Sequence, residues 1–195
     1  MLRHMHPDDH LRHLLEAEAA GELPPLLPFW GHRPRADGRI GTACLSQWWP
    51  SPFTVDGVEY GTAEHWMMAG KARLFGDETA LDAVLAAGTP GAAKAAGRTV
   101  RDFDEKAWRE ARYGLVVEGN RHKFTQHPEL GRYLLGTAPA VLVEASPVDR
   151  IWGIGLAAAD EAVRTPSRWR GLNLLGFALV DVRQELATAA DTRHV

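Results

Sequence analysis

The sequence has little cysteine, no long apolar run and no excess of positive charge. Cys44 is the single cysteine among 195 residues, which excludes an internal disulfide and a zinc site built from several cysteines and fits a reducing compartment. No apolar run approaches the roughly 20 residues of a membrane helix, and the first 20 residues lack the apolar core of a secretory signal. We therefore expect a cytoplasmic protein with no membrane partner.

The charged residues are nearly balanced, with 22 Lys and Arg against 25 Asp and Glu and a net charge of −3. This balance gives the chain no general attraction for nucleic acid, although it does not exclude a local basic pocket. Seven tryptophans stand out instead, because several lie beside glycine, proline or charged residues rather than inside apolar runs. This placement is typical of flat rings that line a surface or a pocket.

The length and the apolar share of 45% suit one globular domain with short additions at its ends. Residues 1–28 are interpreted as an N-terminal extension. It comprises a short helix over 9–20, which ends at Gly21, and a proline-rich extended connector. The domain then spans 29–187, and residues 188–195 are expected to form a flexible tail.

Local patterns predict a mostly α domain with a few short β-strands, including one hairpin. Asp56-Gly57 between two β-prone tripeptides predicts that hairpin over 53–60. Capping residues and apolar spacing predict helices at 63–75, 77–87, 90–97, from Asp104 to the basic cluster 119–124, 128–135 and 174–186. Residues 141–143 predict a buried strand. The chain lacks the βαβ alternation of a Rossmann sheet.

Residues 62–71 hold the richest set of chemical groups. Glu64 falls in the first turn of its predicted helix, where the helix dipole favours a carboxylate. Lys71 follows seven positions later, so both side chains project from one face, two turns apart. The pair could bracket a small polar ligand. From spacing alone, a Glu64 that assists capping and a solvated Lys71 are the favoured interpretation.

A second candidate segment is 144–156, in which Asp149 follows a Ser-Pro turn and precedes Trp152. Gly153 and Gly155 would let the backbone approach a ligand closely, and Trp152 could stack on a base or a sugar. Equally, Asp149 could form a local turn and Trp152 could belong to the core. The sequence leaves both interpretations open.

Three further residues have a structural and a ligand-binding interpretation. Asn173 could cap the last helix or read the polar groups of a ligand. Lys123 is well placed for the helix dipole, while Lys123 or Arg98 could instead contact a phosphate. The N-terminal histidines lack an ordered framework, so no metal site is expected. His65 is expected to be packed or hydrogen-bonded, and Cys44 to be a buried small apolar residue.

Together these segments resemble the NADAR family, also called YbiA-like N-glycosidases. The matching pieces are Phe29-Trp30, the Asp56-Gly57 hairpin, 62–77, 97–104, Trp108, 119–124, 142–156 and 169–176. They cover nearly the whole of 29–187 in the family's order. The chain departs at one place: family members commonly carry Ser-Asn-Phe before the hairpin, and this chain has Ser46-Gln47-Trp48-Trp49. No asparagine contact is carried over there.

The resemblance implies a hydrolase of the ribosyl C–N bond that uses no cofactor. One branch of the family cleaves phosphoribosylamino-pyrimidine intermediates of riboflavin biosynthesis, which implies a small ribosylated molecule as the substrate. Another branch removes ADP-ribose from guanine, in a nucleoside or in nucleic acid. A non-catalytic module that binds ADP-ribose or NAD is the alternative from another class. Two carboxylates in the motifs favour the enzyme, because a binder of an anion gains little from them.

The resemblance also implies the roles of particular residues. By motif, family function maps onto Glu64, Trp108, Asp149 and Trp152, and Lys71 matches a position proposed for covalent chemistry. We expect Glu64 and Asp149 to meet across a gap sized for one sugar, where a carboxylate stabilises the oxocarbenium ion or activates water and an acid protonates the leaving amine. Trp108 and Trp152 would wall the base and sugar. Alternatively, Lys71 attacks C1′ as a neutral amine, which needs a pKa lowered by burial.

Overall fold

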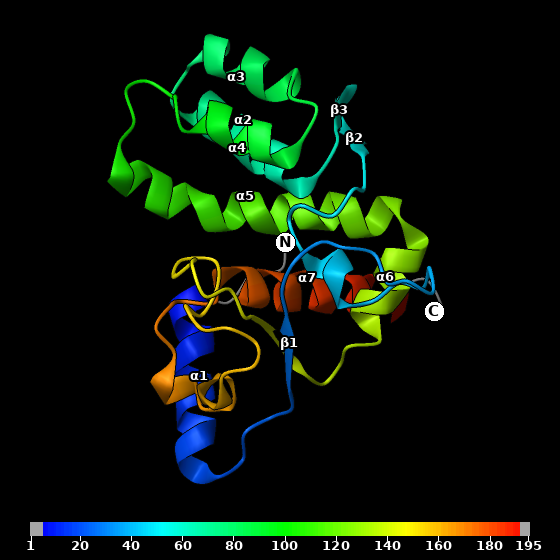
Figure 1. Cartoon of the computed structure of the whole chain (residues 1–195), viewed down its shortest axis with the longest axis vertical. Helices are drawn as coiled ribbons and strands as arrows, with labels where there is room; N and C mark the ends of the chain where they lie inside the picture. Colours follow the sequence, from blue (N-terminus) through cyan, green and yellow to red (C-terminus); the bar gives the residue numbers. More distant parts are fainter. Residues whose placement is uncertain (1–5, 192–195) are drawn as a thin grey trace. The chain divides into compact units, whose positions relative to one another are not determined.

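The computed structural model describes residues 6–191, and their contacts divide the chain into two compact units. Unit 1 contains the chain up to Ser46 and from Glu129 onward, and unit 2 contains Gln47–Pro128. Helices dominate both units, and the strands form two small two-stranded sheets (Figure 1). The predicted mostly α class with a few short strands is therefore confirmed. Within the described part of the chain, no helix combines the length and the apolarity that a membrane span needs.

Unit 2 begins with the predicted hairpin. Strands β2 (Phe53–Val55) and β3 (Val58–Tyr60) pair antiparallel, with Phe53 opposite Tyr60. Asp56 and Gly57 both have positive φ, at 49° and 80°, which is the backbone conformation that a tight two-residue hairpin loop requires. The exposed side chain of Gln126 bonds to the N–H and the C=O of Thr54, at 2.9 and 2.8 Å, and so holds β2 against the end of α5 (Glu105–Gln126).

Each helix of unit 2 begins directly after a residue whose side chain caps its first turn. The side chain of Thr62 caps α2 (Ala63–Leu74), that of Asp77 caps α3 (Glu78–Leu85), that of Thr89 caps α4 (Pro90–Gly97), and that of Asp104 caps α5. Each cap accepts a backbone N–H from the first turn, which would otherwise lack a partner. The predicted starts of these helices are confirmed to within one residue.

Helix α2 lies against α3, α4 and α5, and Figure 1 shows α2, α3 and α4 on one side of α5. Glycines allow the close approach of α2 and α5. A Cβ at Gly119 would lie 2.4 Å from Cδ1 of Trp66, and one at Gly70 would lie 2.8 Å from Cδ2 of Leu115. The indole N–H of Trp66 donates to the Leu115 carbonyl at 2.9 Å, so the contact is also hydrogen-bonded. Nine of the twelve α2 residues are buried, which makes α2 the core helix of unit 2.

Unit 1 is built around a parallel pair of strands. Strand β1 (Leu26–Phe29) pairs with β4 (Val141–Glu144), and helix α7 (Leu174–Asp191) packs against β4. The short helices are η1 (Thr42–Leu45), α6 (Pro128–Leu135), η2 (Glu161–Arg164) and η3 (Pro166–Arg168). A cluster of buried side chains extends the core from β4 toward η2: Val143, Ala145, Ile154, Leu156, Ala162 and Val163.

The segments near both ends of the described residues pack within unit 1. The sequence predicts an extended connector up to residue 28, and in the structure its last residues belong to strand β1. The strand could not be predicted locally, because its partner β4 lies more than 100 residues away in the sequence. Helix α1 (Pro7–Ala20) contacts α7 and η3 within unit 1: His10 Nε2 lies 2.8 Å from an Asp181 carboxylate oxygen, and Ser167 donates twice to Glu18. At the other end, α7 continues to Asp191, and the last four positions of the predicted tail 188–195 lie outside the described residues.

Candidate active site

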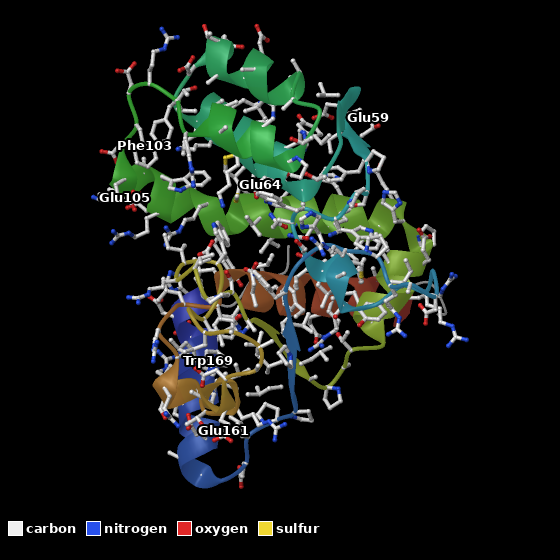
Figure 2. The ribbon with its side chains drawn as sticks, in the orientation of Figure 1. Glu59, Glu64, Phe103, Glu105, Glu161 and Trp169 are labelled. Carbon is white, nitrogen blue, oxygen red and sulfur yellow. The ribbon has the colours of Figure 1, made fainter. Side chains whose placement is uncertain are left out.

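The first candidate catalytic residue in unit 2 is Glu64, in the first turn of α2. Glu64 is 2% exposed, so its carboxyl group is shielded from solvent. The N–H of Glu64 donates to the backbone carbonyl of Gln47 at 3.1 Å, which ties the start of α2 to the chain ahead of the hairpin. Figure 2 labels Glu64 among the unit 2 side chains. At a helix N-terminus the dipole favours a carboxylate, while burial strengthens electrostatic interactions and removes the hydration of the charge.

Lys71 lies two turns further along α2, in a half-buried aromatic setting. Its ammonium Nζ donates to the Gly97 carbonyl at 2.9 Å and lies 4.3 Å from the ring centre of Phe103 and 5.9 Å from that of Trp108. Burial is the largest influence on the Lys71 pKa and lowers it from its ordinary value. Lys71 is therefore not a fully solvated surface charge, and its proposed role toward a ligand stays a prediction.

Two charged neighbours modulate the Lys71 pKa in opposite directions. The Glu105 carboxylate raises this pKa, and the Arg98 guanidinium lowers it by a smaller amount. The structure thus gathers three predicted residues, Lys71, Arg98 and Trp108, in one part of unit 2. It adds Phe103 and Glu105, which Figure 2 labels at the same end of α5. Phe103 lies in segment 97–104, one of the segments that resemble the family, but no role was expected for it from the sequence.

The Asp149 loop of unit 1 is held by its own backbone. One oxygen of the Asp149 carboxylate accepts the N–H groups of Ile151 and Trp152, both at 2.8 Å. The Asp149 N–H donates in turn to Ser146 Oγ at 3.2 Å. This is the local turn that the sequence offered as one interpretation. The turn fixes the direction of the carboxylate, and both Asp149 and Trp152 keep partial solvent exposure.

The glycines of this loop are required by its own packing. A Cβ at Gly153 would lie 2.7 Å from the Glu144 carbonyl oxygen, and one at Gly171 would lie 2.3 Å from the Gly153 carbonyl oxygen. Gly155 has a φ of 68°, a conformation that side chains disfavour. Close packing of the loop therefore accounts for these glycines, and the predicted contacts of Gly153 and Gly155 with a substrate stay predictions.

Asn173 and Lys123 are both fully buried. The Asn173 side chain accepts the Glu144 N–H and donates to the Leu142 carbonyl, each at 2.9 Å, so it joins β4 to the start of α7. Both ends of the amide therefore bond to backbone groups of β4. Lys123 Nζ lies 5.0 Å from the ring centre of Phe124. The proposed ligand contacts of Asn173 and Lys123 stay predictions, as does the pairing of Glu64 with Asp149 across one cavity.

Two residues with catalytic chemistry have structural roles. His65 is buried, with Nδ1 2.8 Å from Thr62 Oγ1 and Nε2 3.0 Å from the Ala87 carbonyl oxygen. The expectation of a packed, hydrogen-bonded histidine is confirmed. Cys44 is fully buried in unit 1, as predicted. No cluster of three or more potential metal ligands occurs among residues 6–191.

Sequence reasoning missed an amide pair next to Glu64. Asn120 Nδ2 donates to Gln47 Oε1 and to the Val116 carbonyl, both at 2.8 Å. Gln47 is 7% exposed and Asn120 is 0% exposed. Within the described part of the chain, Gln47 Nε2 and Asn120 Oδ1 are buried without a hydrogen-bond partner. The two residues lie 73 positions apart, so no local pattern links them.

Comparison with known proteins adds four findings. The model of the NADAR domain family matches residues 28–187. N-glycosidase R617 of Acanthamoeba polyphaga mimivirus is 43% identical over 153 residues, which cover 75% of this chain and 89% of that protein. N-glycosidase YbiA of Escherichia coli strain K12 is 34% identical over 136 residues, which cover 70% and 76%. The NMR structure of E. coli YbiA is similar with a TM-score of 0.68 at 29% identity, over 86% of this chain and 88% of that one.

Proposed function

The chain belongs to the NADAR family, and with that membership as the premise we propose that it is an N-glycosidase that hydrolyses a ribosyl C–N bond. Relatives named N-glycosidase match most of the chain, and the family match spans both units. The proposed substrate is a phosphoribosylamino-pyrimidine, an intermediate of riboflavin biosynthesis. This substrate is a small, negatively charged molecule, so it fits a protein whose net charge of −3 offers no broad grip on nucleic acid.

The setting of Lys71 is the observation that carries this proposal. Cleavage of a ribosylamine needs a group that can act on C1′ and flat surfaces for the base. Lys71 supplies a partly buried amine with a lowered pKa, and Phe103 and Trp108 supply rings beside it. A lowered pKa increases the fraction of neutral amine, which is the nucleophilic form. Arg98, whose positive charge lowers the Lys71 pKa, is proposed to attract a phosphate of the substrate.

The covalent scheme starts from the open-ring form of the ribosylamine, in which C1′ is an imine carbon. The neutral Lys71 amine adds to C1′, the base leaves as an amine with a proton, and Lys71 keeps C1′ as a Schiff base. Water then adds to this carbon and releases the sugar as an aldehyde, which restores the amine. Water is the only co-reactant, and no electron is transferred. The Gly97 carbonyl would orient Nζ through its hydrogen bond.

The carboxylate scheme needs no covalent intermediate. As the C–N bond breaks, positive charge develops at C1′, and the buried Glu64 carboxylate would stabilise that charge or deprotonate the attacking water. Asp149 is proposed as a second catalytic carboxylate, held in one direction by the N–H groups of Ile151 and Trp152. Trp152 would then offer its ring to the sugar or base.

Removal of ADP-ribose from guanine is the second candidate, because the partly buried Lys71 amine could serve either substrate and matches the position proposed for covalent chemistry in that branch of the family. A panel of substrates with product identification by mass separates the candidates. Ribose 5-phosphate released from a phosphoribosylamino-pyrimidine supports the first, and ADP-ribose released from ADP-ribosylated guanosine supports the second. A protein that binds ADP-ribose and releases neither product would be a binding module. Borohydride trapping of a sugar adduct on Lys71 would support the covalent scheme, and its absence during turnover would contradict it.

A further inference from the structure

Gln47 and Asn120 form a buried amide pair inside unit 2. Their side chains share one hydrogen bond, from Asn120 Nδ2 to Gln47 Oε1 at 2.8 Å, and Asn120 Nδ2 also donates to the Val116 carbonyl. The pair is joined to the candidate site, because the Gln47 backbone carbonyl accepts the N–H of Glu64 at 3.1 Å. The Gln47 member of the pair is therefore hydrogen-bonded to the turn of α2 that contains Glu64.

The hydrogen-bond inventory of the pair is incomplete. Each amide has one acceptor oxygen and one donor nitrogen. Asn120 Nδ2 and Gln47 Oε1 are used, while Gln47 Nε2 and Asn120 Oδ1 are buried with no partner among residues 6–191. Native proteins rarely keep buried polar atoms unsatisfied. One donor and one acceptor thus remain on two side chains that are directly bonded to each other.

Other amide side chains of the chain show what a purely structural role looks like. Gln126 uses its oxygen for the Thr54 N–H and its nitrogen for the Thr54 carbonyl. Asn173 likewise bonds at both ends, to the Glu144 N–H and the Leu142 carbonyl. Gln47 and Asn120 differ from both, because each leaves one end unused. The unused ends are complementary, which suits a single partner with an acceptor next to a donor.

We propose that Gln47 and Asn120 read the lactam edge of the substrate base, the –NH–C(=O)– group that uracil-type pyrimidines and guanine share. Gln47 Nε2 would donate to the ring carbonyl oxygen, and Asn120 Oδ1 would accept the adjacent ring N–H. This inference rests on the proposed N-glycosidase function and adds a rule of specificity to it. Bases without the lactam, such as 2-aminopurine, would leave both amide atoms unsatisfied. Sites built from buried polar groups reject such analogues strongly.

The test compares the binding of guanosine with that of 2-aminopurine riboside by calorimetry, with the full chain and with recovery of the intact ligands checked by mass. The two ligands share the ribose, the purine ring and the amino group at C2 and differ in the lactam. Guanosine is expected to bind about 10- to 100-fold more tightly, as expected for buried hydrogen bonds that the analogue cannot make. Equal affinities, or no binding of either ligand, would overturn the inference.

Two methionine variants locate the effect. Gln47→Met keeps the length of the side chain and removes its donor, so the preference for guanosine is expected to disappear. Gln126→Met removes an amide of the same type whose two ends serve Thr54, and it is expected to keep the preference. A Gln47→Met protein that still prefers guanosine would overturn the inference and indicate that ordered water satisfies the pair. If Gln47→Met does not fold, the comparison of the two ligands on the unmodified chain still decides.

The same preparations distinguish this inference from the proposed function. Hydrolysis of a ribosylated substrate without a lactam preference would refute the recognition role of Gln47 and Asn120 and leave the N-glycosidase intact. A lactam preference without hydrolysis of any substrate in the panel would support the recognition role and refute the proposed activity.

Discussion

Replacement of Glu64 by glutamine is the most direct test of the chemistry at the start of α2. The substitution keeps the shape of the side chain and removes the carboxylate that would stabilise charge at C1′ or activate water. A positioned acid or base typically accelerates a reaction about 10²- to 10⁴-fold, which corresponds to about 3–5 kcal/mol of transition-state free energy. We therefore expect kcat/KM of Glu64→Gln to fall by about that factor.

The stability of the same variant should change far less. Glu64 is 2% exposed in the first turn of α2, where a carboxylate gains about 0.3–1 kcal/mol from the helix dipole. Loss of that contribution shifts the Tm of a chain of this size by about 2–4 °C per kcal/mol, and relief of a buried charge offsets part of it. The variant should thus be folded and nearly inactive, which separates a catalytic role from a structural one.

The assay follows product release by mass, beside thermal unfolding of the same samples. Glu59→Gln is the matched control, because Glu59 is an exposed glutamate on β3 of the same unit and is labelled in Figure 2. It is expected to leave both turnover and Tm unchanged. Unchanged turnover in a folded Glu64→Gln protein would remove Glu64 from the mechanism, and equal losses in both variants would show that the effect is not local.

The surroundings of Lys71 predict a pH effect: the Glu105 carboxylate raises the Lys71 pKa, so Glu105→Gln lowers this pKa further and moves the rise of amine-dependent kcat/KM to lower pH. A pH profile that does not move would contradict that coupling. Gly119→Ala places a methyl group 2.4 Å from the indole ring of Trp66. We therefore expect the free energy of unfolding, measured by chemical denaturation, to fall by about 1–3 kcal/mol. At Gly114 an added Cβ meets nothing within 4 Å, and Gly114→Ala should be neutral or stabilising; a Gly119→Ala protein as stable as this control would refute the close packing. The Asp77 side chain caps α3 and accepts hydrogen bonds from Arg101, and these bonds hold the Asp77 pKa below its ordinary value of 3.8. Its stabilisation is present at neutral pH and is lost as the pH falls, so Asp77→Asn should lower Tm most at neutral pH, and a difference from the unmodified chain that stays constant into acid would refute this.

Local chemistry explains why so many elements could be predicted from the sequence. Asp56-Gly57 predicts the hairpin because few residues adopt positive φ at two successive positions. Thr62 and Asp104 predict helix starts because their side chains satisfy N–H groups within three residues of themselves. Interactions of this range depend only on the neighbouring sequence. The NADAR motifs, read in order, also predict the family that the comparisons confirm.

Long-range pairing explains what the sequence did not predict. The segment of β1 carries prolines and resembles a connector, and only its pairing with β4 makes it a strand. Gln47 and Asn120 look like ordinary polar residues until the fold buries them side by side. No periodic pattern records which amide atoms then remain unsatisfied.

The sequence by itself determined the family, the α-rich class, the starts of the helices and the set of chemical groups, because these depend on residue type and on neighbours a few positions away. The tertiary structure decided which of those groups differ from ordinary surface residues. Spacing alone favoured a solvated Lys71, and the fold instead placed it against the Gly97 carbonyl and the rings of Phe103 and Trp108, where burial lowers its pKa. Desolvation and hydrogen-bond satisfaction depend on segments distant in the chain, so only the packed molecule fixes them.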